Sequence, residues 1–437
     1  MTDRLLLGEQ SAGLSSLADT LDEQLAAADA ALTEHYPGDR GVRQPIHTVY
    51  IPADRYTATT VPDWGREALA VLDAHGSSPE QFASASGMRL ELASEVYPLV
   101  RRKLETEPIE DLRIDFEDGF GNRPDAEEDA TAVGAARALA DSVREGIAAP
   151  FHGIRFKSFE APTRRRGLRT LDLFLGELVR AGGLTEGFLL TLPKVTSVDQ
   201  VQAMVTACAW LEDAHTLPAG RLGFEIQVET PQSILGSDGS ALVARMIHAS
   251  GGRCTGLHYG TYDYSASTGV SAEYQSMEHA VADYAKAVMQ VAAAGTGVFV
   301  SDGSTNVLPV GDDAAVRRGW SLHARLVRRS LERGYYQGWD LHPAQLPTRY
   351  AATYAFYREG FAGAAARLRA YLGQQESASG RQARQKTQFL DEPATAVALA
   401  GFVLRGLECG AIDEAELASD IGVETTRLAQ LARRRVG

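Results

Sequence analysis

Acidic side chains follow short apolar runs in the middle of the chain. Glu229 comes directly after the run 223–228, and Asp263 follows the run 255–259. Two carboxylates without histidine or cysteine ligands favour a hard cation, which prefers oxygen ligands. Such a site leaves coordination positions open for water and substrate. This arrangement suits Mg²⁺, and Mn²⁺ could replace it. We therefore predict that Glu229 and Asp263 are metal ligands.

A metal ion held in this way could chelate the carboxylate and carbonyl oxygens of a small 2-oxo acid. It would polarise the carbonyl and stabilise an enolate or alkoxide during aldol or Claisen chemistry. Arg155, which ends another apolar run, is predicted to stabilise the developing oxyanion. The backbone amides of Gly260, Thr261 and Tyr262 precede a predicted helix, and we predict that they bind the substrate carboxylate.

The elements that must position these residues alternate between short apolar runs and amphipathic stretches. This βαβα rhythm predicts a parallel sheet covered by helices, and eight runs favour a closed (β/α)₈ TIM barrel. Loops after the strands of such a barrel all open on one face, so the polar residues at the strand ends should meet there. The predicted strands are residues 47–51, 112–116, 153–156, 188–192, 223–228, 255–259, 297–300 and 335–341; the predicted helices are 62–74, 78–105, 126–145, 166–181, 198–214, 274–294 and 314–333.

The length of 437 residues allows one barrel with additional segments at both ends. Residues 1–45 are predicted as an N-terminal helical extension and 46–373 as the catalytic barrel. A polar stretch, 374–388, is predicted as a linker, and 389–437 as a small C-terminal helical module.

The composition excludes several classes of partner. With 57 acidic and 43 basic side chains the formal net charge is -14, which disfavours binding to nucleic acid or to an anionic membrane. Three distant cysteines and the absence of an apolar N-terminal stretch predict a cytoplasmic protein without disulfides. Residues 415–432 also read as a helix-turn-helix, but this acidic chain makes a packing module the better interpretation than a DNA-binding unit.

The strand-end motifs resemble those of the citrate lyase β-subunit and HpcH/HpaI aldolase superfamily. The resemblance implies that Asp115 and Glu117 hold metal-bound water and Arg155, that Lys194 belongs to the substrate site, and that the chain is a lyase. It implies a small oxo acid or its acyl-CoA adduct as substrate, and barrels of this kind are commonly homo-oligomers. The motifs are Asp115-Phe-Glu117-Asp118, Ile154-Arg155, Leu192-Pro-Lys194, Val228-Glu229-Thr230 and Tyr259-Gly-Thr-Tyr-Asp263.

A further stretch, Leu390-Asp-Glu-Pro-Ala-Thr-Ala396, is similar to a motif of malate synthases whose aspartate enolises acetyl-CoA. Here Glu392 has the matching place and Asp391 is shifted by one, so both are candidates for the base. Pro393 suits the first turn of a helix, so an equal alternative is that Asp391 or Glu392 caps this helix and is not the base. Claisen condensation of glyoxylate with acetyl-CoA therefore stands as the alternative to a lyase.

Two further functions are disfavoured. A non-catalytic barrel would not need the complete set of Glu229, Asp263 and Arg155. Phosphoryl transfer would call for a glycine-rich phosphate loop with lysine and serine or threonine, and no such motif is present in the sequence.

Overall fold

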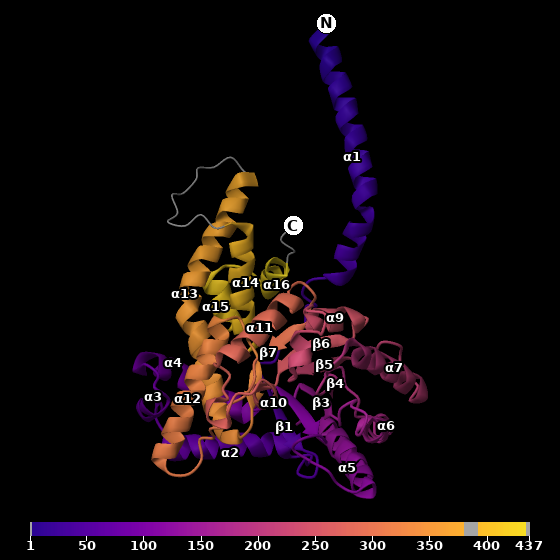
Figure 1. Cartoon of the computed structure of the whole chain (residues 1–437). Helices are drawn as coiled ribbons and strands as arrows, with labels where there is room; N and C mark the ends of the chain where they lie inside the picture. Colours follow the sequence, from indigo (N-terminus) through magenta and orange to yellow (C-terminus); the bar gives the residue numbers. More distant parts are fainter. Residues whose placement is uncertain (1, 380–391, 434–437) are drawn as a thin grey trace.

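The chain folds into a barrel of eight parallel strands surrounded by helices (Figure 1). A computed structural model describes residues 2–379 and 392–433, and the side chains of residues 14–373 and 392–433. This confirms the predicted (β/α)₈ barrel. The strands are β1 (His47–Pro52), β2 (Asp111–Asp115), β3 (Phe151–Arg155), β4 (Phe188–Leu192), β5 (Phe224–Val228), β6 (Cys254–Tyr259), β7 (Phe299–Ser301) and β8 (Gly338–Asp340).

The strands are hydrogen-bonded in the order β7-β6-β5-β4-β3-β2-β1-β8, and every pair is parallel. The remaining seam, between β7 and β8, is bridged by Ser301 and Gln337, and the Asp302 amide donates to the Gln337 carbonyl at 2.8 Å. These bonds close the sheet, so all the loops that follow strands open at one end of the barrel.

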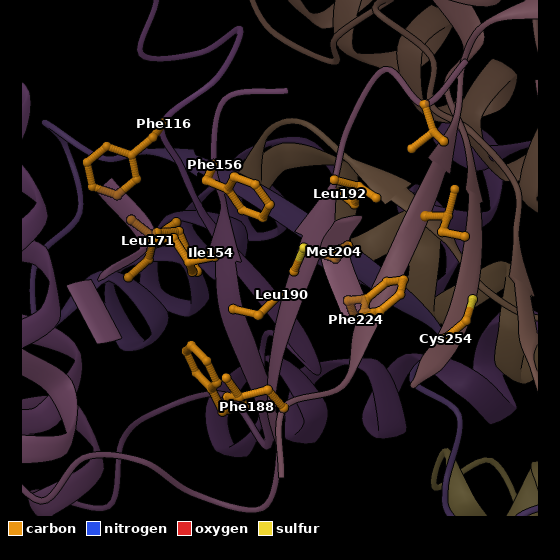
Figure 2. Close-up of a cluster of buried hydrophobic side chains, with 14 of the residues drawn as sticks. Phe116, Ile154, Phe156, Leu171, Phe188, Leu190, Leu192, Met204, Phe224 and Cys254 are labelled. Carbon is orange, nitrogen blue, oxygen red and sulfur yellow. The ribbon is translucent and has the colours of Figure 1, made fainter. Parts of the chain in front are cut away.

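Side chains on each strand alternate between two environments. Apolar residues point outward and pack against the surrounding helices, as Figure 2 shows for Ile154, Leu190 and Phe224. The inward positions carry polar side chains. Near the amino ends of the strands, buried Arg113 donates to Glu225 at 3.0 and 2.6 Å, and His258 Nε2 lies 3.0 Å from the same carboxylate. The interior of this barrel is therefore an ion-paired network.

The helices follow the predicted order with local differences. The predicted helix 78–105 is two helices, because Gly87 adopts a left-handed conformation (φ 77°) that ends the first of them. The predicted helix 274–294 is a short 3₁₀ turn, η1 (Ala272–Tyr274), followed by α11. The barrel helices are α2 (Thr60–His75), α3 (Pro79–Ser86), α4 (Leu90–Thr106), α5 (Asp125–Arg144), α6 (Arg164–Arg180), α7 (Val198–Ala214), α8 (Pro231–Ile234), α9 (Leu242–Ala249), α10 (Thr261–Ser267), α11 (Ala280–Ala293) and α12 (Asp313–Glu332).

Additional helices extend the barrel at both ends of the chain. The predicted N-terminal helix is present as α1 (Thr2–His35). After a 3₁₀ turn, η2 (Pro343–Gln345), the long α13 (Leu346–Ser379) runs into the segment predicted as a linker, whose residues 380–388 lie outside the described part of the chain. The C-terminal module comprises α14 (Pro393–Glu408), α15 (Glu414–Asp420) and α16 (Thr425–Ala432).

The C-terminal module has a core of its own with α13. Leu417 and Leu428, from the two helices that read as a helix-turn-helix, are buried with Tyr354 of α13 and Leu404 of α14. These apolar faces are used for packing, which agrees with the packing module predicted. None of the described helices is long and apolar enough to cross a membrane, and the three cysteines are free and buried.

Candidate active site

Arg155 is held by Asp115 at the carboxyl ends of two neighbouring strands. The register of β2 and β3 pairs these residues directly. Arg155 Nε and Nη2 donate to the two carboxylate oxygens of Asp115 at 2.7 and 2.6 Å. The amides of Glu117 and Gly119 also donate to Asp115, at 2.9 and 2.8 Å. Because its oxygens are committed to these four donors, Asp115 is a positioning residue for Arg155 and not a free base.

One edge of the Arg155 guanidinium remains open. Its Nη1 lies 3.6 Å from Glu117 Oε2 and donates to Gln227 Oε1 at a long 3.4 Å. The guanidinium carbon, Cζ, lies 4.7 Å from the centre of the Tyr50 ring. Burial lowers the pKa of Arg155, but Asp115 and Glu117 raise it by more, to well above its ordinary value. The guanidinium therefore keeps its charge and offers Nη1 to an anionic partner.

Two buried glutamates in the site bind protons more tightly than usual. Burial raises the pKa of Glu229 to about 8, and the charges of Glu117 and Asp263 add to this rise against the opposing Lys194 and Arg155. Burial likewise raises the pKa of Glu117 to about 7, with a contribution from Asp118. Raised pKa values of this kind arise where carboxylates share a site with little water.

Lys194 connects these carboxylates. Its ammonium lies 2.7 Å from Asp263, 3.2 Å from Glu117 and 3.1 Å from Asp118, and its backbone amide donates to Glu229 at 2.7 Å. Lys194 has a φ of 51°, a left-handed conformation that is uncommon for a residue with a side chain. The acids come from the ends of β2, β5 and β6, so the barrel gathers them at one mouth as predicted from the sequence.

The donor set fits a hard cation. Glu229 and Asp263 offer only carboxylate oxygens, and the charge of Asp263 adds to the rise in the pKa of Glu229, a cost of ionisation that a bound cation would offset. Within the described residues no group of three or more histidine, cysteine or acidic side chains could hold a metal ion. Water and substrate oxygens would therefore have to complete the coordination, and the Lys194 ammonium would have to leave Asp263.

Gly260 is required where β6 passes Glu229. A Cβ atom at Gly260 would lie 2.5 Å from Glu229 Cβ and 2.9 Å from Glu229 Oε2. The Gly260 amide donates to the Val228 carbonyl at 3.0 Å, which corrects its predicted role in substrate binding, because its only proton is already used. The amides of Thr261 and Tyr262 remain for the predicted carboxylate site.

We expect Gly260→Ala to displace Glu229 and to weaken Mg²⁺ binding by at least about 10-fold, in the range of changes to groups that orient metal ligands. Isothermal titration with Mg²⁺ would measure this loss. The matched control is Gly134→Ala on α5, where a Cβ meets no atom within 4 Å. Equal Mg²⁺ affinity in both variants would contradict the placement of Glu229 in the metal site.

Glu392, at the start of α14, lies away from this mouth. Helix α13 starts after β8, and its Tyr350 already donates to the Pro108 carbonyl, at 2.9 Å, beside the amino end of β2. Helices α13 and α14 pack antiparallel, since Gly360 lies against Phe402 while the earlier Tyr357 lies against the later Gly406. The start of α14 is therefore beyond the amino-terminal end of the barrel.

Glu392 is at the N-cap position of α14, where its exposed side chain makes no capping hydrogen bond. This placement separates Glu392 from the strand ends of its own chain by the length of the barrel, so Glu392 could act as the base only at the site of a neighbouring copy. The other candidate, Asp391, lies outside the described residues.

Two residues of the site, Tyr50 and Gln227, were not among those predicted, and both contact Arg155. Asp118, which belongs to the motif that follows β2, contacts Lys194. The alternation of β5 would have indicated Gln227, which is two residues before Glu229 and faces the same side. Its buried Nε2 has no hydrogen-bond partner within the described part of the chain, so it is a donor available beside Arg155.

A cavity of about 540 Å³ lies at the other, amino-terminal end of the barrel. Two of the arginines that line it are paired with carboxylates: Arg113 with Glu225 and Arg253 with Glu212. We attribute these pairs to stability, because chemistry in such barrels takes place at the carboxyl ends of the strands.

Comparisons with known proteins agree with this fold. Residues 25–436 match the family described as Domain of unknown function (DUF6986). The sequence matches no curated protein. Among solved structures, a citrate lyase from Burkholderia xenovorans LB400 is similar over 88% of this chain and 100% of its own, with 17% identity and a TM-score of 0.56.

Two further solved structures are similar at lower scores. A malate synthase from Haloferax volcanii, in a magnesium/glyoxylate complex, has 13% identity and a TM-score of 0.44 over 90% of this chain and 89% of its own. An HpcH/HpaI aldolase/citrate lyase family protein from Burkholderia cenocepacia J2315 has 15% identity and a TM-score of 0.36 over 69% of this chain and 90% of its own.

Proposed function

The chain belongs to the DUF6986 family, whose description states no function. From the residues of the site, we propose that it is a Mg²⁺-dependent carbon–carbon lyase that acts on a small 2-oxo acid or its acyl-CoA adduct. The observation that carries the proposal is the meeting of Glu229 and Asp263 with the open Nη1 edge of Arg155 at one barrel mouth. The citrate lyase of similar fold supports the same class of reaction.

The side chains have separate roles in this proposal. Mg²⁺, held by Glu229 and Asp263, would supply a Lewis acid for the carbonyl and carboxylate oxygens of the substrate. Arg155 Nη1 and Gln227 Nε2 donate to the oxygen that becomes negative when the carbon–carbon bond breaks and its electron pair forms an enolate. A base takes the hydroxyl proton of the substrate as the bond breaks, and a proton is later returned to the enolate carbon.

Glu117 is the best candidate for that base. Its pKa of about 7 allows it to take and return a proton near neutral pH. It lies beside both Arg155 and Lys194, so its charge is compensated after ionisation. Lys194 and the amides of Thr261 and Tyr262 are proposed to bind the substrate carboxylate.

The assay follows directly from this assignment. Purified protein is incubated in deuterated water with Mg²⁺ and pyruvate, oxaloacetate or glyoxylate, with and without acetyl-CoA, and products are followed by proton NMR. We expect exchange or cleavage next to the carboxylate of an oxo acid that stops when EDTA is added. Absence of any Mg²⁺-dependent exchange or cleavage in this set of acids would overturn the proposal.

We expect Glu392→Gln to keep activity within about 2-fold of the wild type, because the residue lies beyond the opposite end of the barrel. The turnover rate with the substrate found above measures this. Asp391→Asn is tested in parallel as the neighbouring candidate. A large loss in either variant, together with exchange of acetyl-CoA methyl protons, would favour the malate-synthase-like reaction instead.

A further inference from the structure

One side of the barrel mouth is apolar. The charged groups of the site follow strands β2 to β6, whereas β1 and β8 contribute Tyr50, Pro52, Trp339 and Leu341. Tyr50 faces the barrel interior, where it contacts Arg155, and Trp339 packs against its ring with the ring centres 4.6 Å apart. Because side chains alternate along a strand, Pro52 and Leu341, each two residues further on, face the same side. These four residues form the apolar wall.

The preceding residue, Asp340, fixes the direction of Leu341. The Asp340 carboxylate lies outside the barrel, where Arg349 of α13 binds it at 3.0 Å. Leu341 therefore turns inward, and its amide donates to Gln345 Oε1 at 2.7 Å. Strand β8 pairs with β1 up to Asp340, so the next residue, Leu341, lies beside Tyr50.

The apolar wall is open to the mouth. Leu341 is 37% exposed, and Tyr50 and Pro52 are half-buried. Because Leu341 faces inward at the carboxyl end of β8, its exposed part is directed to the mouth. The polar atoms of the wall lie deeper: the Tyr50 hydroxyl donates to Glu225 at 3.4 Å, and Trp339 Nε1 is buried. The wall therefore presents carbon atoms and offers no charged group of its own.

A ligand in the mouth meets both kinds of surface. In the proposed function, on which this inference rests, the charged groups bind the oxo acid end of the substrate. Tyr50 lies directly against Arg155, so the carbon chain of a substrate bound at Arg155 reaches the apolar wall. An alkyl or aryl group is stabilised there because it leaves water. A second carboxylate would lose water without gaining a charged partner from the wall, which is unfavourable.

We propose that the substrate is a 2-oxo acid with an alkyl or aryl group on its carbon chain, and that Leu341 and Tyr50 recognise this group. Glyoxylate and pyruvate offer the wall at most a methyl group, and dicarboxylic oxo acids offer it a charge. One methylene in a hydrophobic pocket changes specificity by about 10- to 200-fold. Because the wall is partly open to water, we expect a preference near the lower end of this range.

Titration calorimetry of the full chain with Mg²⁺ tests this specificity. The Kd values of pyruvate, 4-methyl-2-oxopentanoate and 2-oxoglutarate are compared, and we expect 4-methyl-2-oxopentanoate to bind about 10-fold more tightly than either of the others. Leu341→Ser should largely remove this preference. Leu341→Arg should reverse it in favour of 2-oxoglutarate, because a guanidinium can pair with the second carboxylate. The matched control is Leu168→Ser on α6, a leucine that is also 37% exposed but lies outside the barrel.

The outcomes separate this inference from the proposed function. If the acids bind only with Mg²⁺ but have equal Kd values, the specificity inference is wrong and the lyase proposal stands. A preference for 4-methyl-2-oxopentanoate that Leu341→Ser retains would also overturn the inference, because the wall would not be its cause. If none of the three acids binds in the presence of Mg²⁺, both proposals are wrong. Circular dichroism checks that each variant is folded.

Discussion

Glu229→Gln is expected to abolish Mg²⁺-dependent turnover and to leave the barrel folded. Replacing even an outer partner of a metal ligand costs 10- to 100-fold, so the loss of a ligand should exceed about 100-fold. Steady-state kinetics over a range of Mg²⁺ concentrations would measure the effect. Glu145→Gln, which changes an exposed acid on the surface, is the matched control. Asp263→Asn should behave like Glu229→Gln.

The same variant has a distinct effect on stability without metal. The pKa of Glu229 is about 8 in the folded chain against an ordinary value of 4.5. As the pH rises, the unfolded chain loses this proton near pH 4.5, whereas the folded chain keeps it until about pH 8. The free energy of unfolding therefore falls as the pH rises from about 4.5 to about 8. Each unit of difference corresponds to about 1.4 kcal/mol, so the loss by pH 8 is on the order of a few kcal/mol.

Glutamine carries no titrating proton and removes this loss. Without Mg²⁺, we expect the variant to be more stable than the wild type at pH 8, with a difference that shrinks toward pH 5. With Mg²⁺ at pH 8, the wild type should regain stability and the variant should not. Thermal unfolding at the two pH values measures both effects. Near-normal Mg²⁺-dependent activity in Glu229→Gln would show that the metal assignment is wrong.

Arg155→Lys is expected to lower kcat by about 100-fold or more, with a smaller change in KM. Lysine keeps the positive charge, but an ammonium cannot bind both oxygens of Asp115 and still present a donor to the substrate. Rapid-mixing or steady-state kinetics at saturating Mg²⁺ would separate kcat from KM.

Asp115→Asn provides the comparison for this prediction. It removes the negative charge that orients Arg155 without removing the guanidinium, so its loss of kcat should be smaller than that of Arg155→Lys. Arg144→Lys on the surface is the control for the substitution itself. An Arg155→Lys enzyme within a few-fold of the wild type would place Arg155 outside the reaction.

Much of this fold follows from local sequence patterns. Apolar runs such as 188–192 alternate with amphipathic helices, and alternation along a strand separates Ile154 from Arg155, so the parallel barrel and its polar mouth were predictable. The sequence did not predict that helix 78–105 is split at Gly87. A glycine inside a helical pattern can continue the helix or end it, and the tertiary surroundings decide between the two.

The partners within the site depended on the tertiary structure. Sequence indicated Lys194, Glu229 and Asp263 as strand-end residues, but only the folded chain brings the Lys194 ammonium to Asp263 and its amide to Glu229, since these contacts join residues 35 to 69 positions apart. The spacing of residues at the strand ends likewise could not show that the Gly260 amide donates to Val228, or that Glu229 leaves no room for a side chain at Gly260.

The sequence alone determined the barrel and the end of it that carries polar residues, because both depend on local periodicity. It also determined that the proposed metal ligands, Glu229 and Asp263, offer carboxylate oxygens, because this depends only on residue type. Tertiary structure decided which acids keep protons and where the C-terminal module lies. Proton affinity depends on burial and on charges from several strands, and the direction of α13 takes Glu392 past the far end of the barrel.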